Sequence, residues 1–356
     1  MQQMLEQFQD QVRTSALEKR ALRIRGGGTK DWYGQRFEGE ILDTRAYAGI
    51  VDYEPTELVI TARCGTPLAE IEAALAERQQ MLAFEPPHFG EGATLGGAIA
   101  AGLSGPRRAS SGALRDFVLG ARLLDGKGDV LTFGGQVMKN VAGYDVSRLL
   151  AGSMGTLGLL LEVSVKVLPL AYREATLRFE MNEVDAIRKL NEWGGQPLPI
   201  SASCWIDGVL ALRLSGAQAA VDAAIRTLGV AHGGHLMPDC AQFWAGLREQ
   251  RHAFFAGDAP LWRLSVPSTV GAIVLGGPQL IEWGGAQRWL RADGDAAGAA
   301  RIRATVAACG GHATLFRGGD KNAGVFEPLA PAVAKIHERL KAGFDPSNIF
   351  NPGRMY

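Results

Sequence analysis

Glycine-rich loops are the segments of this sequence whose residue types and spacing could do chemistry. Residues 91–115 (EGATLGGAIAAGLSGPRRASSGALR) combine glycines with serine, threonine and arginine, and residues 25–30 (RGGGTK) repeat that combination in miniature. Because glycine has no Cβ, consecutive backbone N–H groups can turn toward one point and hold an anion such as a phosphate. Two such loops predict a diphosphate held from both sides.

The common nucleotide-binding motifs do not explain these loops. A Rossmann unit needs G-x-G-x-x-G between a strand and a helix, and residues 26–28 lack the third glycine. The P-loop pattern G-x-x-x-x-G-K-S/T does not occur either. Ordinary tight turns remain the simplest explanation of any single loop. A third loop at 152–158 (GSMGTLG) and an unusual Pro- and Gly-containing tail favour a ligand instead.

Composition excludes several classes of protein. The chain has 356 residues and equal numbers of acidic and basic residues, 37 each, so it has no general attraction to nucleic acid or anionic lipid. Its four cysteines lie far apart, which predicts no structural metal site or iron–sulfur cluster. No apolar run reaches the ~20 residues needed to span a bilayer, and the N-terminus lacks a signal-peptide pattern. We expect a cytoplasmic protein that reaches the inner face of the cell membrane only through partners.

Residues 1–170 predict one α+β domain. Residues 1–20 form an amphipathic pattern typical of a helix, and residues 21–25 read as a strand that enters the first glycine loop. Thr66 is predicted to cap a second helix with Pro67 at its first position, and Leu68, Ile71 and Leu75 share one face. Further strands are predicted at residues 58–61, 117–124, 130–133 and 159–167.

Residues 171–330 predict a second domain with an antiparallel sheet covered by helices. A strand at 176–181, a helix capped by Asn182, a hairpin turn at 207–208 and a helix over 217–229 follow the order of a ferredoxin-like half. Val184, Ile187 and Leu190 are expected on one side of the first helix. A similar order returns with strands at 261–266, 280–283 and 312–316 and a helix at 296–308.

The C-terminal segment, residues 331–356, predicts a helix from Pro331 to Gly343 followed by a rigid tail. Residues 344–354 (FDPSNIFNPGR) hold two prolines and a glycine, which favour a fixed irregular conformation over a frayed end. We expect this tail to pack against the ligand region.

The three loops and the tail together resemble the vanillyl-alcohol-oxidase family of flavoproteins, which carry a PCMH-type FAD-binding domain. Residues 25–30 are similar to the family's R-x-G-G-x-S/T pyrophosphate loop, residues 92–97 (GATLGG) to its G-T-I-G-G loop, and residues 153–158 to its G-S-E-G-T-L-G segment. Residues 351–354 (NPGR) resemble its terminal N-P-G-K/R. The resemblance implies a fold of the α+β class, with a PCMH-type domain of two α/β subdomains and then a cap domain.

The same resemblance implies which residues bind FAD. The set contains the first loop, the second loop, parts of the third segment and a few positions between them. These residues are Arg25, Gly26, Gly27, Gly28, Thr29, Lys30, Pro86, Ala93, Thr94, Gly96, Gly97, Ser104, Gly105, Ser111, Gly155, Thr156, Gly158, Val163 and Asn351. Relatives that attach flavin covalently have a histidine where this chain has Thr29, and no cysteine lies between Cys64 and Cys204. FAD is therefore expected to bind non-covalently.

A narrower resemblance is to the FAD-binding subunits of bacterial glycolate oxidases. It extends over nearly the whole chain through residues 64–68 (CGTPL), 85–88 (EPPH), 105–108 (GPRR), 115–120 (RDFVLG), 137–145 (VMKNVAGYD), 243–244 (FW), 283–286 (WGGA) and 353–356 (GRMY). The resemblance implies a complex with a larger, homologous FAD subunit and an iron–sulfur subunit. In such a complex glycolate, a small 2-hydroxy acid, is oxidised to glyoxylate and the electrons leave through the clusters.

Catalytic residues are much less clearly marked. Oxidation of a 2-hydroxy acid needs a cation for the carboxylate and a base or metal for the hydroxyl. Arg248, Arg251 and Arg263 are candidates for the carboxylate and His252 for the base, but a solvated basic helix face explains them equally well. Related catalytic subunits carry H-x-G-D-G-N-x-H, whereas the similar stretch at 311–320 has only His312. No metal site is predicted.

Three functions therefore remain open from the sequence. The chain could be a flavin subunit that supports glycolate oxidation within the complex. It could instead be a non-catalytic structural or electron-relay subunit whose homologous partner does the chemistry. A stand-alone oxidase that uses oxygen is the least favoured alternative, because the resemblance points to a complex.

Overall fold

The computed structural model describes residues 1–135 and 144–355, which form two compact units. The first unit contains residues 1–103, 113–169 and 328–356, and the second contains residues 104–112 and 170–327. The sequence predicted boundaries at residues 170 and 330. The structure differs chiefly in assigning residues 104–112, which lie in the second half of the glycine-rich stretch 91–115, to the second unit.

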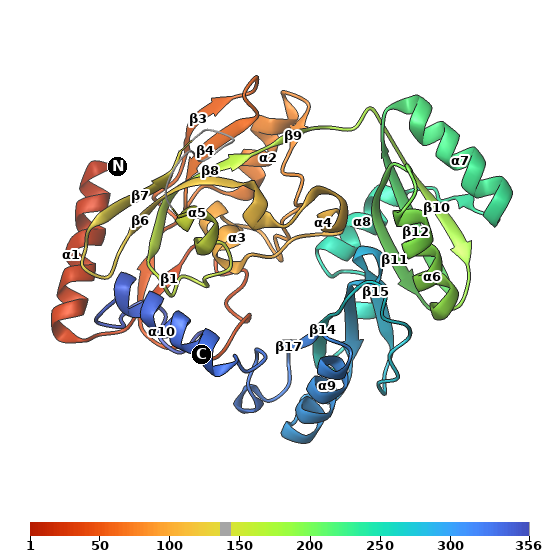
Figure 1. Cartoon of the computed structure of the whole chain (residues 1–356). Coiled ribbons are helices and arrows are strands. Elements are labelled where there is room, and N and C mark those ends of the chain that lie inside the picture. Colours follow the sequence, from red (N-terminus) through yellow and green to blue (C-terminus); the bar gives the residue numbers. More distant parts are fainter. Residues whose placement is uncertain (136–143, 356) are drawn as a thin grey trace. The chain divides into compact units, whose positions relative to one another are not determined.

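The first unit is built on a five-stranded sheet with the order β3-β4-β8-β6-β7 (Figure 1). Its strands are β3 (Ile50–Glu54), β4 (Val59–Arg63), β6 (Val118–Leu124), β7 (Val130–Gly134) and β8 (Leu159–Lys166). Every pairing in this sheet is antiparallel. Strand β8 is central because it is an almost continuous apolar run buried on both faces.

Two smaller sheets complete the strands of this unit. β1 (Leu22–Arg25) pairs in parallel with β2 (Glu40–Asp43), and β5 (Gln80–Met81) pairs with β9 (Leu168–Pro169). The last residues of the chain extend the first of these sheets, since Phe350 forms a parallel bridge with Leu22. The tail is thus fixed, as its prolines predicted, beside the strand that enters the first glycine loop.

Helices cover the sheets of the first unit. They are α1 (Gln2–Glu18), α2 (Leu68–Ala76), α3 (Leu95–Ala101), α5 (Val146–Leu150) and α10 (Pro331–Phe344), with a short 3-10 helix η1 (Leu114–Phe117). Leu68, Ile71 and Leu75 of α2 are buried as predicted, and burying each such side chain contributes about 1.5–3 kcal/mol. The predicted cap was wrong: Pro67 occupies the N-cap position, and the Thr66 hydroxyl bonds to the backbone of Gly49.

The second unit is organised around one eight-stranded sheet with the order β13-β10-β12-β11-β15-β16-β14-β17. Its strands are β10 (Arg173–Glu180), β11 (Ile200–Ile206), β12 (Val209–Gly216), β13 (His235–Leu236), β14 (Leu261–Ser265), β15 (Gln279–Glu282), β16 (Gln287–Arg291) and β17 (His312–Arg317). All neighbouring strands are antiparallel. The two predicted halves therefore share a single sheet, joined where β11 pairs with β15, and β16 is a strand that the sequence did not predict.

The helices of the second unit pack apolar residues against this sheet. α6 (Glu183–Gly194) and α7 (Gln218–His232) share a core with β10 and β12, and α9 (Ala296–Ala308) packs against β14 and β17 (Figure 1). α4 (Arg108–Ser111), α8 (Cys240–Arg248) and the 3-10 helices η2 (Ala253–Phe255), η3 (Trp283–Gly285) and η4 (Lys321–Ala323) complete it.

Two details of the predicted helices of the second unit need correction. Asn182 caps α6 as predicted, and Ile187 and Leu190 are buried as predicted, together with Ala186 and Trp193, but Val184 is 60% exposed. α7 continues to His232 and ends at Gly233, whose φ of 69° suits a left-handed C-cap, so Gly229 does not stop it.

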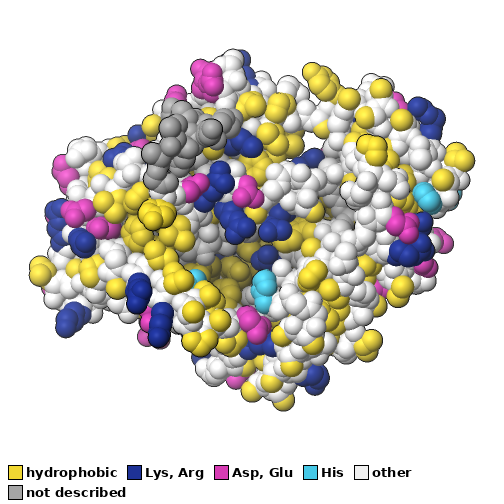
Figure 2. Space-filling view, viewed as in Figure 1, with side chains coloured by type: hydrophobic (Ala, Val, Ile, Leu, Met, Phe, Trp, Pro, Cys, Tyr) yellow, Lys and Arg dark blue, Asp and Glu magenta, His cyan; other side chains and the backbone are white. Residues whose placement is uncertain are grey.

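Charge and helix length agree with the composition. Acidic and basic side chains both occur across the visible face in Figure 2, as expected from 37 residues of each sign. Within residues 1–135 and 144–355, no helix is both long enough and apolar enough to cross a bilayer.

Candidate functional site

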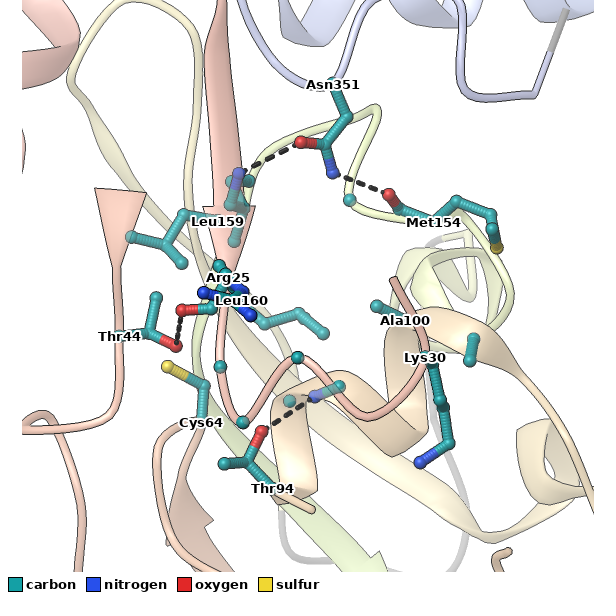
Figure 3. Close-up of a pocket in the computed structure, with 18 of the residues that line it drawn as sticks. Arg25, Lys30, Thr44, Cys64, Thr94, Ala100, Met154, Leu159, Leu160 and Asn351 are labelled. Carbon is teal, nitrogen blue, oxygen red and sulfur yellow. Dashed lines mark hydrogen bonds between the residues drawn. The ribbon is translucent and has the colours of Figure 1, made fainter. Parts of the chain in front are cut away.

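The three glycine loops and the C-terminal tail of the first unit meet at one pocket of about 710 Å³, part of it open to solvent. Of the residues predicted to bind FAD, twelve line it: Arg25, Gly26, Gly27, Gly28, Thr29, Lys30, Thr94, Gly96, Gly97, Gly155, Gly158 and Asn351. The lining comes from positions as distant in sequence as residues 24 and 354. The fold therefore brings together the segments that the sequence could only relate by composition (Figure 3).

The loop at 26–29 presents a row of backbone donors. β1 delivers the chain into this loop, and Thr44 holds its start by bonding to the carbonyl oxygen of Arg25 through both its N–H and its hydroxyl. No acceptor in the described part of the chain bonds the backbone N–H groups of Gly26, Gly27, Gly28 or Thr29. Neighbouring N–H groups without acceptors form a concavity suited to a phosphate oxygen.

Steric contacts explain why this loop is glycine. A Cβ on Gly27 would collide with the carbonyl group of Gly92, so the first two glycine loops lie in backbone contact. Gly28 has a φ of 72°, a left-handed conformation that other residues rarely adopt. The close packing of residues 27 and 92 explains why position 27 needs glycine, and it places both loops at one pocket. Gly92 itself has a φ of 80°, which favours glycine there.

The second loop contributes differently from the prediction. The N–H groups of Leu95, Gly96 and Gly97 already donate to the Thr66 carbonyl, the Cys64 carbonyl and the Thr94 hydroxyl, at 2.9, 2.8 and 3.2 Å. Thr94 thereby acts as the N-cap of α3 (Figure 3). These bonds make residues 95–97 a rigid wall of the pocket, whereas the backbone N–H groups of residues 26–29 remain available.

The third glycine segment is joined to the tail by Asn351. The Asn351 side-chain oxygen accepts from the Ile24 N–H at 2.9 Å, and its amide nitrogen donates to the Met154 carbonyl at 2.8 Å (Figure 3). A Cβ on Gly155 would lie 2.7 Å from that amide nitrogen. Asn351 is 1% exposed and has a φ of 41°, a conformation that asparagine tolerates better than most residues. This side chain holds three separate segments at the pocket wall.

Cations outnumber acids among the lining residues. Arg25, Lys30 and Arg354 are basic, and Asp31 is the acidic member of the lining. Asp31 is already engaged by Arg23 at 2.6 Å and Arg25 at 2.8 Å. Lys30 is only 7% exposed, and its ammonium group donates to the His88 carbonyl at 3.2 Å. The balance of charge and the exposed backbone donors both suit an anionic ligand.

A buried thiol also lines the pocket. Cys64 is 2% exposed, and burial raises the pKa of its thiol to about 12, although hydrogen bonding with the Thr44 side chain opposes that shift. A neutral buried thiol behaves as a small apolar side chain, not as a nucleophile. Its position next to Gly96, where an added Cβ would approach the Cys64 Cβ to 2.6 Å, makes it a packing residue of the wall.

Seven of the predicted FAD-binding residues lie elsewhere. In the first unit Pro86, Ala93, Thr156 and Val163 are buried but do not line this pocket; Val163, for example, is 1% exposed within β8. Ser104, Gly105 and Ser111 belong to the second unit, where the Gly105 carbonyl accepts from the indole N–H of Trp283. Residues 137–143 and Tyr356 of the quoted motifs lie outside the described residues.

The sequence prediction missed ten lining residues. These are Ile24, Asp31, Thr44, Cys64, Ala100, Ala101, Met154, Leu159, Leu160 and Arg354. Half of them are apolar residues of β1, α3 and β8, and nothing in their type marks a site. Cys64, Met154 and Arg354 stand in motifs quoted from the sequence, so their positions carried a signal that was not used.

The predicted catalytic residues all belong to the second unit, and each has a local structural partner or is exposed. Arg248, the last residue of α8, pairs with Glu249 at 2.8 Å, and Arg251 is exposed. His252 accepts the Phe254 N–H through Nδ1 at 3.2 Å and so caps a 3-10 helix. The structure thus gives these three residues no shared geometry that marks a catalytic centre.

Arg263 on β14 is placed differently from the other arginine candidates. Its guanidinium lies 5.4 Å from the centre of the Trp283 ring and donates to Gln287 at 2.9 Å. No carboxylate among the described residues lies within 4 Å of it. His312 of the neighbouring strand β17 lies on the same face of the sheet as Arg263. Desolvation, and then the positive charge of Arg263, lower the pKa of the His312 imidazole. Within the described ranges no three His, Cys, Asp or Glu side chains gather as a metal site.

Comparison with known proteins shows the family to which the chain belongs. Residues 3–134 match the family model described as "FAD binding domain". The chain is 49% identical over 347 residues to the glycolate oxidase subunit GlcE of Escherichia coli (strain K12), a match that covers 98% of this chain and 96% of that protein. It is 35% identical over 121 residues to a D-lactate dehydrogenase of Anaerostipes hadrus, covering 34% and 25% of the two chains.

The fold has a solved counterpart as well. A structure of alkyldihydroxyacetonephosphate synthase superposes with a TM-score of 0.67, covering 97% of this chain and 74% of that one at 14% sequence identity. That likeness supports the predicted α+β, PCMH-type fold and nothing further. The predicted cofactor is supported by the family match, and the pocket's free backbone donors and excess of cations fit the FAD diphosphate. The chain therefore belongs to the GlcE family of FAD-binding glycolate oxidase subunits.

Proposed function

We propose that this chain is the FAD-binding subunit of a glycolate oxidase complex and supports the oxidation of glycolate, a 2-hydroxy acid, to glyoxylate. In this proposal the electrons pass to an iron–sulfur subunit, and a larger homologous FAD subunit completes the complex. The observation that carries the proposal is the row of free backbone donors at 26–29 in the pocket of the first unit. A chain that had lost its flavin would not need to keep glycine at position 28, whose φ of 72° other residues rarely adopt.

The residues proposed to hold FAD are those of the pocket. The N–H groups of residues 26–29 would donate to the diphosphate, and the wall formed by α3, residues 154–160 and Asn351 would fix the remainder of the cofactor. When bound, FAD supplies the acceptor for the hydride that leaves the alcohol carbon. Binding is proposed to be non-covalent, because neither Thr29 nor the buried thiol of Cys64 offers a nucleophile.

For the substrate carboxylate we favour Arg263 over Arg248 and Arg251. A guanidinium held against an aromatic ring by a neutral partner keeps its charge available and its position fixed. Arg263 has both features through Trp283 and Gln287, whereas Arg248 is neutralised by Glu249. Trp283 itself has a φ of 54°, a strained conformation for a large side chain that the surrounding structure must maintain.

The alternative is a flavin subunit that only relays electrons or supports assembly. Two observations favour it: His252 is occupied as a helix cap, and no metal-binding group of side chains exists in the described ranges. Neither His252, the predicted base, nor a metal group is then in place for the substrate hydroxyl in the described part of the second unit. The homologous partner would then perform the chemistry.

Anaerobic reduction by glycolate separates the two functions. The purified chain should show flavin absorbance, and glycolate should bleach it in the assembled complex. Bleaching in the isolated chain at a rate comparable to turnover would assign hydride transfer to this subunit. Bleaching that requires the partner would assign the relay role. A chain isolated without any flavin, and unable to take it up, contradicts both.

Variants of Arg263 test the substrate site in the complex. Arg263→Met should raise the KM for glycolate at least about tenfold, because a charged hydrogen bond contributes about 1.5–3 kcal/mol. Arg251→Met, an exposed arginine of the same unit, is the matched control and should change KM by less than about twofold. An unchanged KM in Arg263→Met would remove this arginine from the site.

A further inference from the structure

Arg354 is a cation of the FAD pocket that the FAD-binding motifs did not include. It lies in the tail segment that follows Phe350, and the backbone of that segment is bonded to β1. The Leu22 N–H donates to the Ile349 carbonyl at 2.7 Å, and the Asn351 N–H donates to the Leu22 carbonyl at 2.9 Å. These bonds fix the backbone of the tail, and with it the position from which the Arg354 side chain extends.

The hydrogen bonds of the Arg354 guanidinium go to backbone carbonyl groups alone. Nη2 donates to the carbonyl oxygen of Lys30 at 3.1 Å and to that of Tyr33 at 3.4 Å. The group also stacks over the Phe37 ring, 4.1 Å from its centre. Both carbonyls belong to the segment immediately after the free donors at 26–29, so Arg354 is attached to the loop that those donors form.

The charge of Arg354 forms no ion pair with a described residue, although Asp31 lies near enough to favour the charged form and oppose the lowering of its pKa. No carboxylate in those ranges lies within 4 Å of it, and Asp31 is already paired with Arg23 and Arg25. The Nε atom is buried and has no hydrogen-bond acceptor. The Nη1 atom is not among the buried atoms, and it donates to no described residue. Arg354 therefore keeps its Nη1 amino group and its positive charge for a ligand that the chain itself does not supply.

Keeping such a cation buried is costly. Arg354 is 8% exposed, and burial lowers the pKa of its guanidinium to about 10, so it is still protonated at neutral pH. A buried charge without a counter-ion destabilises a fold, and natural chains normally pair it. An anion in the pocket would remove this cost. The two neighbouring features, free N–H donors and an unpaired cation, call for the same ligand chemistry.

We propose that Arg354 supplies the counter-charge for the diphosphate of FAD, acting together with the backbone donors of residues 26–29. The proposal rests on FAD binding, which the proposed function shares, and not on glycolate oxidation. Arg354 acts on the diphosphate through its charge and Nη1, while Nη2 keeps the loop in place. The flavin ring is not its target.

Comparing two ligands isolates this role. FAD contains the diphosphate and riboflavin has the same ring without it, so the ratio of their dissociation constants reports on the diphosphate alone. We would measure both constants by calorimetry on the flavin-free full chain, for the wild type and for Arg354→Gln, Arg354→Lys and Arg339→Gln. Arg339 is an exposed arginine of α10 and serves as the control.

The expected result is selective. Arg354→Gln should weaken FAD about 10- to 100-fold while riboflavin changes less than about twofold, because only the charged hydrogen bond is lost. Arg354→Lys should keep most of the preference for FAD, and Arg339→Gln all of it. Equal losses for FAD and riboflavin would show that Arg354 only shapes the loop, and an unchanged FAD affinity would remove it from the site.

A variant that fails to fold does not leave the question open. If Arg354→Gln is unfolded, Arg354→Lys decides, because lysine retains the charge but loses the planar fork that bonds two carbonyls. A lysine variant that binds FAD no more tightly than riboflavin would overturn the proposal. Glycolate turnover is not a readout here, so failure of the proposed function leaves this test intact.

Discussion

The side-chain amide of Asn351 donates a 2.8 Å hydrogen bond to the carbonyl oxygen of Met154, across 197 positions of the sequence. The other end of the same amide accepts from the Ile24 N–H at 2.9 Å. One buried side chain thus joins the strand before the first glycine loop, the third glycine segment and the tail. The stability of the pocket and the order of the C-terminus are therefore coupled.

Replacing Asn351 with alanine should loosen all three segments. Asn351→Ala leaves a buried N–H and a buried carbonyl without partners and places alanine at a φ of 41°. We expect a loss of about 2–4 kcal/mol in the free energy of unfolding, measured by urea denaturation. Asn322→Ala, an exposed asparagine of the second unit, should change it by less than about 0.5 kcal/mol. A variant as stable as the wild type would show that the tail is held by other contacts.

Gly27 should tolerate no side chain. Gly27→Ala forces a Cβ into the Gly92 carbonyl, so the two loops must separate and the donors at 26–29 lose their arrangement. The purified variant should contain little flavin, judged from visible absorbance per chain. Gly343→Ala is the control, since its Cβ meets nothing within 4 Å and alanine favours the α10 helix. Full flavin content in Gly27→Ala would contradict the contact between the loops.

The tail is also held by a buried ion pair. Lys341 Nζ lies 2.5 Å from the Asp345 carboxylate and donates to the carbonyls of Thr156 and Phe350 at 2.7 and 2.9 Å. Lys341→Met leaves Asp345 unpaired at 1% exposure and should lower the free energy of unfolding by about 3–5 kcal/mol.

A double variant separates the pair from its surroundings. Lys341→Met combined with Asp345→Asn removes the lone charge, so part of the loss should return in the same denaturation experiment. Added FAD should raise the melting temperature of each variant, because ligand binding stabilises the folded state. A double variant less stable than the sum of the two single changes would contradict a simple pair.

Thiol labelling should distinguish the four cysteines by burial and pH. Burial raises the pKa of Cys64 to about 12 and that of Cys204 well above its usual value. A thiol with a pKa of about 12 is only about 10⁻⁴ ionised at pH 8, because ionisation falls tenfold for each unit of pH below the pKa. Iodoacetamide at pH 8 should therefore modify Cys240 and Cys309, which are half-buried, before Cys64 and Cys204.

Mass spectrometry of the labelled peptides checks this order. Urea should make all four cysteines reactive, because unfolding returns the buried thiols to water. Raising the pH in the native state should increase labelling of Cys64 only as the pH approaches its elevated pKa. Rapid native labelling of Cys64 at pH 8 would show that the pocket wall opens more readily than the structure implies.

Much of the fold could be predicted from local patterns. The helix at residues 296–308, the Asn182 cap and the central apolar strand β8 follow from periodicity, capping chemistry and hydrophobicity, each of which acts between near neighbours. The sequence predictions were wrong where contacts between separate segments outweighed local preferences. Thr66 bonds to Gly49 instead of capping α2, and β16 is a strand because β14 and β15 pair with it on either side.

By itself the sequence determined the glycine positions, the motifs that place the chain in an FAD-binding family, and the rigid tail, because backbone conformation and residue type are encoded locally. Only the tertiary structure decided which N–H groups stay available. It showed that those of residues 95–97 are used within the protein and those of 26–29 are not. It also placed Arg354 in the pocket with no described carboxylate within 4 Å, since the nearby Asp31 pairs with Arg23 and Arg25. The first result depends largely on Cys64 and Thr66 of a preceding segment, and the second on Lys30 and Tyr33, which lie 324 and 321 positions from Arg354. Contacts between separate segments are not recorded in a local pattern.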